Sequence, residues 1–132
     1  MTVKPVREGF HTVTPYLIVQ EAARLIDFVK QAFGATEHFR DTGSAGGIHA
    51  EVQIGDSMVM IGGDGAWSGE PSPATLYLYL DDVDAVYKRA LQAGATSIME
   101  PANQPYGDRL GGVKDAFGNT WYISTHIEDV QL

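Results

Sequence analysis

The chain has 132 residues, a formal net charge of −8 and no cysteine. A chain of this length can bury a sizeable core as one unit, so we expect a single domain over residues 1–132. The absence of cysteine excludes disulfides, thiolate nucleophiles and cysteine-ligated zinc or iron–sulfur sites. The acidic balance disfavours nucleic acid as a partner and favours a neutral or cationic small molecule.

Membrane and export signals are not apparent in the sequence. No apolar run approaches the roughly 18 to 20 residues of a membrane-spanning helix. The first residues, MTVKPVREGFHTVTP, lack the apolar segment of a secretory signal. We therefore expect a cytoplasmic protein without a membrane partner.

Two stretches of the chain, residues 16–36 and 77–96, share one pattern. Each begins as a short strand with alternating apolar residues and continues as an amphipathic helix. Each predicted helix ends at a glycine, Gly34 or Gly94, which adopts the left-handed conformation of a helix stop without steric cost. The shared pattern indicates an internal repeat.

Strand-like segments follow each helix, and both sets end in a similar phrase, IGDSMVMIG or FGNTWYIST. The pairs Gly55-Asp56 and Gly118-Asn119 within these phrases are typical of tight turns between strands. Each half of the chain therefore predicts one strand, one helix and about three further strands.

This order predicts an α+β fold of two tandem βαβββ modules. The first module covers residues 9–62, the Gly- and Pro-rich stretch 63–74 is the linker, and the second module covers residues 75–132. We expect the mixed and antiparallel strands to form a curved sheet with the helices outside. The inner face of the curve is the expected ligand cleft.

The doubled module, the segment DDVDAVYKRALQAGAT and above all YGDRLGGVKDAFGNTWYISTHIEDV resemble the vicinal oxygen chelate superfamily. This superfamily includes glyoxalase I, bleomycin-resistance proteins, fosfomycin-resistance enzymes and extradiol dioxygenases. The segments FHTVTPYLIV and HAEVQIGDSMVM add a similarity to its PhnB-like branch. The resemblance covers nearly the whole chain and implies the fold, whereas one fold hosts many activities.

Enzymes of this superfamily hold a divalent metal on four cleft positions, two on the first strands of the modules and two on the last. In this chain the resemblance places at these positions Thr14, Val59, Thr75 and Tyr122. None of the four side chains is a usual ligand for zinc, nickel, iron or manganese. We therefore expect no metal cofactor at the standard site.

The strand HAEVQ places His49, Glu51 and Gln53 on one face, because side chains alternate along a strand. In one interpretation His49 and Glu51 are a catalytic base and its orienting partner, or two ligands of a displaced metal. In the other, which a two-residue turn at Gly55-Asp56 favours, they form a solvent-facing polar stripe that points away from the inherited metal position.

Aromatic and hydroxyl side chains share the strand faces expected to line the cleft. They are Thr14, Tyr16, Thr75, Tyr77, Tyr79 and Tyr122. Such a set suits a flat or amphipathic ligand, and the alternative is that the rings fill the cleft as core. Residues 104–112 are expected to form a loop before a strand. On this loop Tyr106 could stack over a ligand and Arg109 could clamp an anionic group. In the alternative, Asp108 and Arg109 only hold the loop together through local hydrogen bonds and a salt bridge.

We predict a metal-independent small-molecule-binding homodimer of the bleomycin-resistance or PhnB-like type, with a cationic or aromatic ligand in the aromatic cleft. One alternative is a metal-dependent lyase, isomerase or dioxygenase with a non-standard site around His49 and Glu51. Another is a structural or interaction module whose cleft is filled by its own tyrosines.

Overall fold

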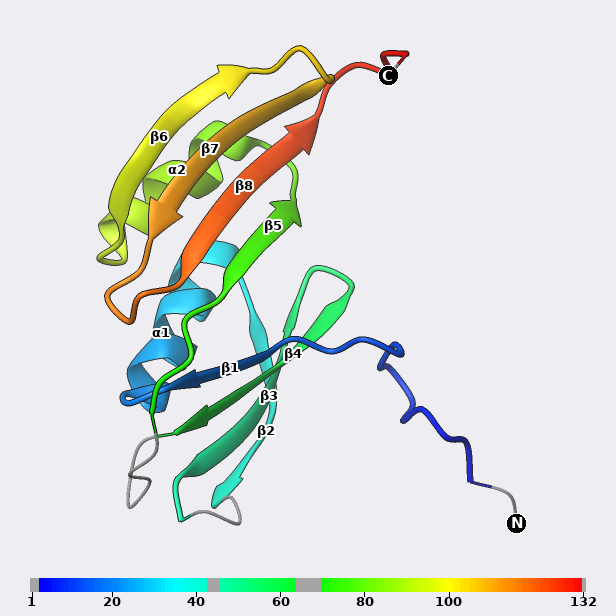
Figure 1. Cartoon of the computed structure of the whole chain (residues 1–132), viewed down its shortest axis with the longest axis vertical. Helices are drawn as coiled ribbons and strands as arrows, with labels where there is room; N and C mark the ends of the chain where they lie inside the picture. Colours follow the sequence, from blue (N-terminus) through cyan, green and yellow to red (C-terminus); the bar gives the residue numbers. More distant parts are fainter. Residues whose placement is uncertain (1–2, 43–45, 64–69, 132) are drawn as a thin grey trace. The chain divides into compact units, whose positions relative to one another are not determined.

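The computed structural model describes residues 3–42, 46–63 and 70–131. The α+β class is confirmed, since these residues form two helices and eight strands in two four-stranded mixed sheets (Figure 1). The expected linker lies partly outside the described residues. No helix in the described part of the chain is long and apolar enough to cross a membrane.

The chain divides into two compact units. The first consists of Met1–Lys30 and Gly34–Ser72, and the second of Gln31–Phe33 and Pro73–Leu132. Each unit contains one four-stranded sheet. Along the chain, each sheet is built from one strand, then a helix follows, and then the other three strands. The strand ladders among the described residues therefore stay within one unit.

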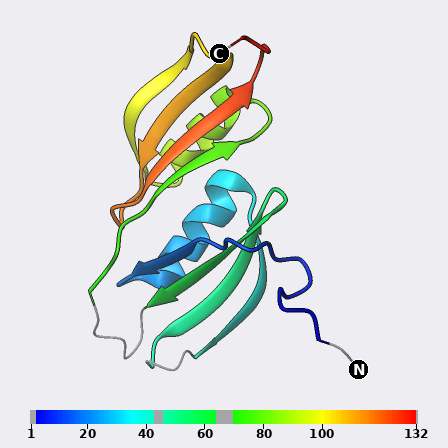
Figure 2. The same ribbon diagram turned by 45° about the vertical axis from the view of Figure 1, so that its right-hand side comes forward.

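In the first unit the strand order is β1-β4-β3-β2, with β1 parallel to β4 and the other pairs antiparallel. The elements are β1 (Tyr16–Val19), α1 (Ala22–Phe33), β2 (Thr36–Thr42), β3 (Ile48–Ile54) and β4 (Ser57–Gly63). Helix α1 lies beside this sheet in both views (Figures 1 and 2). The helix ends at Gly34, as the sequence predicts, where φ is 67°.

The first sheet has one apolar and one polar face, because its side chains alternate. The buried apolar face consists of Leu17, Val19, Ala50, Val52, Ile54, Val59 and Ile61. The opposite face, called the polar face below, carries Tyr16, His49, Glu51, Gln53, Met58 and Met60. A two-residue turn sets this register, since Ile54 pairs with Ser57 and Gly55 adopts a φ of 57°.

In the second unit the strand order is β5-β8-β7-β6, with β5 parallel to β8. The elements are β5 (Thr75–Tyr79), α2 (Val83–Gln92), β6 (Thr96–Asn103), β7 (Asp108–Lys114) and β8 (Thr120–His126). Helix α2 covers one face of this sheet, in contact with β6, β7 and β8 (Figures 1 and 2). The carboxylate of Asp82 caps its start by accepting from the backbone N–H of Ala85.

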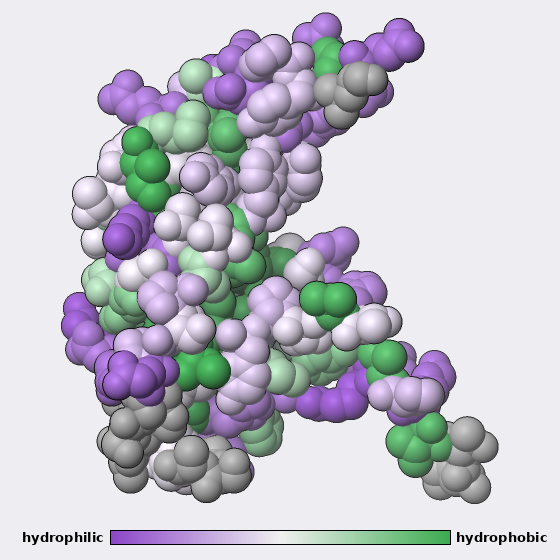
Figure 3. All heavy atoms as spheres, in the orientation of Figure 1, coloured by the Kyte–Doolittle hydropathy of each residue, from purple (hydrophilic) through white to green (hydrophobic). Residues whose placement is uncertain are grey.

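The two faces of the second sheet also differ. Tyr87 of α2 lies against Gly111, so the helix covers the face that carries Arg109, Gly111, Val113, Trp121 and Ile123. The strand register brings a different set to the opposite, helix-free face, called the tyrosine face below. This set includes Thr75, Tyr77, Tyr79, Asp108, Leu110, Thr120, Tyr122, Ser124 and His126. Figure 3 shows mostly side chains of intermediate hydropathy over β5 and β8.

The connection between β7 and β8 differs from the predicted tight turn at Gly118-Asn119. It spans residues 115–119 and is organised by the buried carboxylate of Asp115. This carboxylate accepts hydrogen bonds from two backbone N–H groups of the loop at 2.8 and 2.9 Å. It also accepts from the side chains of Asn119 and Trp121, at 3.0 and 2.8 Å. The longer loop forms because it satisfies all four of these donors.

Candidate functional site

A buried carboxylate lies on the tyrosine face. Asp108, the first residue of β7, is only 3% exposed. Its Oδ2 accepts hydrogen bonds from the hydroxyls of Tyr77, at 2.6 Å, and Tyr79, at 3.1 Å. Its Oδ1 lies 2.8 Å from Nδ1 of His126. This Asp108 cluster therefore ties together β5, β7 and β8.

The hydrogen bonds of the cluster lower the pKa of its acid and raise the pKa values of His126 and Tyr77. The Tyr77 hydroxyl, followed by His126, stabilises the carboxylate and lowers the pKa of Asp108. Asp108, with a second hydrogen bond to Asp129, raises the pKa of His126. Burial and the bond to Asp108 raise the pKa of Tyr77. Near neutral pH the acid is therefore ionised and the tyrosine keeps its proton.

The rings remain accessible although their hydroxyls are engaged. Tyr77 is 42% exposed and Tyr79 is 64% exposed. The ring of Tyr77 lies 5.3 Å from that of Tyr79 and 6.2 Å from that of Tyr122, measured between centroids. Each O–H donates to Asp108. The hydroxyl oxygen of Tyr77 also lies 3.3 Å from Oγ of Ser124, whereas that of Tyr79 can still accept a hydrogen bond. The tyrosine face thus offers ring surface together with a hydrogen-bond acceptor.

Tyr106 lies on a tight turn that leads into the cluster. The backbone N–H of Gln104 donates to the carbonyl of Asp108 at 2.7 Å, and that of Gly107 donates to the carbonyl of Gln104 at 3.1 Å. Gly107 has a φ of 95°, and a Cβ there would lie 2.0 Å from the carbonyl oxygen of Glu128. The turn therefore requires glycine and holds Tyr106, which is 39% exposed, at a defined position.

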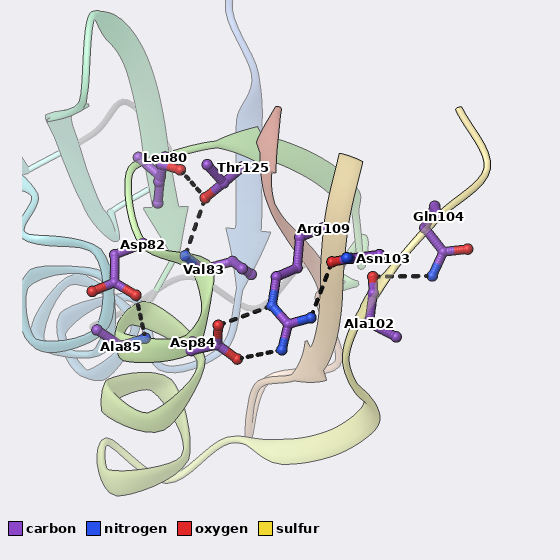
Figure 4. A network of polar contacts seen from close by, with 10 residues as sticks. All are labelled: Leu80, Asp82, Val83, Asp84, Ala85, Ala102, Asn103, Gln104, Arg109 and Thr125. Atoms are coloured by element: carbon purple, nitrogen blue, oxygen red, sulfur yellow. Dashed lines mark hydrogen bonds and ion pairs between the residues drawn. The ribbon is translucent and has the colours of Figure 1, made fainter. Parts of the chain in front are cut away.

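Arg109 points to the helix-covered face and not to the tyrosine face. Its Nε and Nη2 bond to the two carboxylate oxygens of Asp84 on α2, at 2.9 and 3.0 Å (Figure 4). Its Nη1 bonds to Oδ1 of Asn103 at 3.1 Å. Asp108 and Arg109 do not contact each other, because neighbouring strand residues point to opposite faces. Asp108 pairs with His126 instead.

Two predicted ligand residues, Thr14 and Tyr16, belong to the first unit. Thr14 precedes β1, and its hydroxyl donates to the backbone carbonyl of His11 at 3.4 Å. The hydroxyl of Tyr16 lies 3.2 Å from Nδ1 of His49 on the polar face. The structure thus divides the predicted ligand-binding set between the two units. The remaining members on the tyrosine face are Thr75, Tyr77, Tyr79 and Tyr122, and Tyr106 lies beside it.

His49 and Glu51 share a face, as their spacing predicts, but Glu51 does not belong to a solvent-facing stripe. It is 5% exposed, and its two carboxylate oxygens bond to Nη1 and Nη2 of Arg7 at 2.7 and 3.0 Å. This pairing lowers the pKa of Glu51. Nε2 of His49 lies 3.7 Å from the carboxylate. The principal partner of Glu51 is therefore Arg7, which sequence spacing did not identify.

The chain's residues do not fit the metal site of the superfamily. Val59, placed at a metal position by the resemblance, lies on the buried apolar face, where it pairs with Val52. Its neighbour Met60 on the polar face is a thioether, which is no usual ligand for the metals of this fold. Both oxygens of Glu51 are engaged with Arg7. Among the described residues, no group of three or more His, Asp or Glu could hold a metal ion.

The chain is similar to known proteins in both sequence and fold. Residues 9–123 match the model of the Glyoxalase/Bleomycin resistance protein/Dioxygenase superfamily. The chain is 38% identical over 131 residues to the uncharacterized protein Mb0911c of Mycobacterium bovis, a match that covers 91% of this chain and 86% of that protein.

Similar solved structures include TioX from Micromonospora sp. ML1, with a TM-score of 0.67, 22% identity, and coverage of 87% of this chain and 99% of that one. Another is the fosfomycin resistance protein FosX from Listeria monocytogenes, with a TM-score of 0.66, 15% identity, and coverage of 88% and 93%. At these identities the two structures show a shared fold alone.

Proposed function

Because the chain belongs to the glyoxalase/bleomycin resistance protein/dioxygenase superfamily, we propose that it is a metal-independent small-molecule-binding protein with its ligand on the tyrosine face. The main support for this proposal is the way in which two tyrosines are held. Tyr77 and Tyr79 both donate to the buried Asp108, while their rings stay partly exposed. The rings are thus fixed before a ligand arrives, which lowers the entropic cost of binding.

A cationic or aromatic ligand suits this face for three reasons. Tyrosine rings attract cations through their faces and stack on flat ring systems. The hydroxyl of Tyr79 donates to Asp108, so its oxygen can accept a hydrogen bond from a ligand N–H. The net charge of −8 raises the local concentration of cations.

Within the superfamily we place the chain with the bleomycin-resistance and PhnB-like proteins, acting as a cytoplasmic homodimer. The metal-dependent alternative around His49 and Glu51 is less well supported. Metal ligation would require Glu51 to release Arg7, whose guanidinium holds both of its oxygens.

The test is an equilibrium titration of the purified chain with a panel of cationic and aromatic compounds, followed by calorimetry. We expect saturable binding of at least one compound, and a loss of at least about tenfold in affinity for Tyr79→Ala, which removes an exposed ring of the face. Tyr87→Phe is the control, because Tyr87 lies against the opposite side of the sheet. Absence of saturable binding across the panel, or equal affinity in Tyr79→Ala, would contradict the proposal.

A further inference from the structure

We propose that the first unit contains a second, independent binding site for compounds with a guanidinium or amidinium group, in which such a group takes the place of Arg7 on the carboxylate of Glu51. The site is a pocket of about 510 Å³ around Glu51, called the Glu51 pocket below. All of its lining residues belong to the first unit. The proposal therefore does not depend on the tyrosine face.

The polar centre of the pocket is a carboxylate that requires a cation. The side chain of Glu51 is only 6% exposed, and an ionised acid with so little contact with water is costly unless it is paired and hydrogen-bonded. In the structure a planar guanidinium fills this need with two parallel hydrogen bonds, at 2.7 and 3.0 Å. This bidentate geometry distinguishes guanidinium and amidinium groups from a point charge such as an ammonium.

The guanidinium that pairs with Glu51 at the wall of the pocket comes from an exposed segment. Arg7 precedes the first strand, and residues 3–9 are all exposed. The Arg7 side chain itself remains 64% exposed, although its carboxylate partner is buried. Its guanidinium carbon also lies 4.6 Å from the centre of the Phe10 ring. An external guanidinium can therefore replace Arg7 and restore the same two hydrogen bonds.

The walls of the pocket define the rest of the ligand. Phe10, Phe39 and Met58 supply aromatic and apolar surface, and Glu8 and Asp56 add negative charge. Such walls favour a cation that carries an aromatic or aliphatic body. Benzamidine combines a planar amidinium with a ring and is the probe that matches this description.

The experiment compares benzamidine binding by the wild-type chain and by Arg7→Gln, using calorimetry. Arg7 competes as a tethered ligand, so we expect its removal to tighten benzamidine binding at least about tenfold. The double variant Arg7→Gln/Glu51→Gln should lose saturable binding. The reference chain and all variants carry Tyr79→Ala, because a cationic aromatic compound is a candidate for the tyrosine face as well; the comparison with wild type is made in this background. Equal affinity in wild type and Arg7→Gln, or binding retained by the double variant, would overturn the proposal.

Thermal unfolding supplies a second readout in case Arg7→Gln is destabilised. Removal of Arg7 leaves Glu51 without its principal partner, so we expect a lower melting temperature for Arg7→Gln and recovery of that temperature on addition of benzamidine. Butylamine at the same concentration should restore less, because its ammonium cannot form the paired hydrogen bonds. Equal recovery of the melting temperature with both compounds, or no recovery with benzamidine, would contradict the proposed selectivity.

The chain offers a matched control in the pair of Arg109 and Asp84. This pair has the same bidentate geometry, with hydrogen bonds of 2.9 and 3.0 Å, but the Asp84 side chain is 49% exposed. Arg109→Gln makes the same change in net charge as Arg7→Gln. We expect no gain in benzamidine affinity for Arg109→Gln. A gain equal to that of Arg7→Gln would show a general charge effect and would refute a site at Glu51.

Discussion

Single hydrogen bonds decide which groups of the Asp108 cluster carry charge. The pKa of Asp108 is lowered first by the Tyr77 hydroxyl and then by His126, and the pKa of His126 is raised first by Asp108 and then by Asp129. The acid and the histidine thus stabilise each other in their charged forms. Because the tyrosine hydroxyls donate to the same acid, the ionisation of the cluster and the position of the exposed rings are linked.

The raised pKa of His126 predicts a pH-dependent contribution to stability. A group whose pKa is higher in the folded state adds stability that is complete below its unfolded pKa, about 6.5, and that is lost as pH rises through the folded value. We therefore expect His126→Gln to lower the free energy of unfolding more at about pH 5.5 than at about pH 8.5. Urea denaturation at the two pH values measures this difference. An equal loss of stability for His126→Gln at both pH values would show that the pairing with Asp108 does not stabilise the protonated histidine.

At the scale of elements, the two copies of the repeated phrase show how similar sequences form different connections. Gly55-Asp56 forms the expected two-residue turn, in which Asp56 is exposed and accepts from the hydroxyl of Ser57 at 3.1 Å. The second copy is preceded by Asp115, whose buried carboxylate accepts four hydrogen bonds and extends the connection to residues 115–119. A dipeptide pattern alone does not reveal this longer-range acceptor.

The contrast between the two connections predicts different responses to the same substitution. Asp115→Ala should lower the free energy of unfolding by about 2–4 kcal/mol, because it leaves buried donors without an acceptor. Asp56→Ala should change it by less than about 0.5 kcal/mol, as expected for an exposed position. Urea denaturation of both variants near neutral pH makes the comparison. Similar losses at the two positions would contradict the role assigned to Asp115.

At the scale of the whole molecule, the chain keeps the fold of its superfamily while its residues do not fit the metal site. Val59 lies on the buried apolar face, and Tyr122 is a phenol on the tyrosine face. The carboxylate of Glu51 is engaged with Arg7. The donor atoms that zinc, nickel, iron or manganese prefer are therefore not assembled in the described parts of either unit.

This arrangement predicts that stability and ligand binding do not depend on a metal. After incubation with nickel, zinc, manganese or ferrous ions and removal of the excess, we expect well under one ion per chain by mass spectrometry. Treatment with a chelator should leave the melting temperature and the affinity for a tyrosine-face ligand unchanged. One tightly held ion per chain, or a fall in melting temperature on chelation, would contradict the metal-independent function.

The sequence by itself determined the α+β class, the order of elements and the helix stop at Gly34, because periodicity and glycine punctuation are local properties. It also placed His49 and Glu51 on one face, since strand alternation is local.

Only the tertiary structure decided which polar and charged groups meet. Glu51 pairs with Arg7, 44 residues away, and Asp108 pairs with Tyr77, 31 residues away. Such pairings depend on strand register, in which a shift of one residue moves a side chain to the other face. For that reason Val59 lies on a different face from the one that its sequence position had implied. Arg109, predicted on a loop, lies in β7 with its side chain bonded to Asp84 of α2.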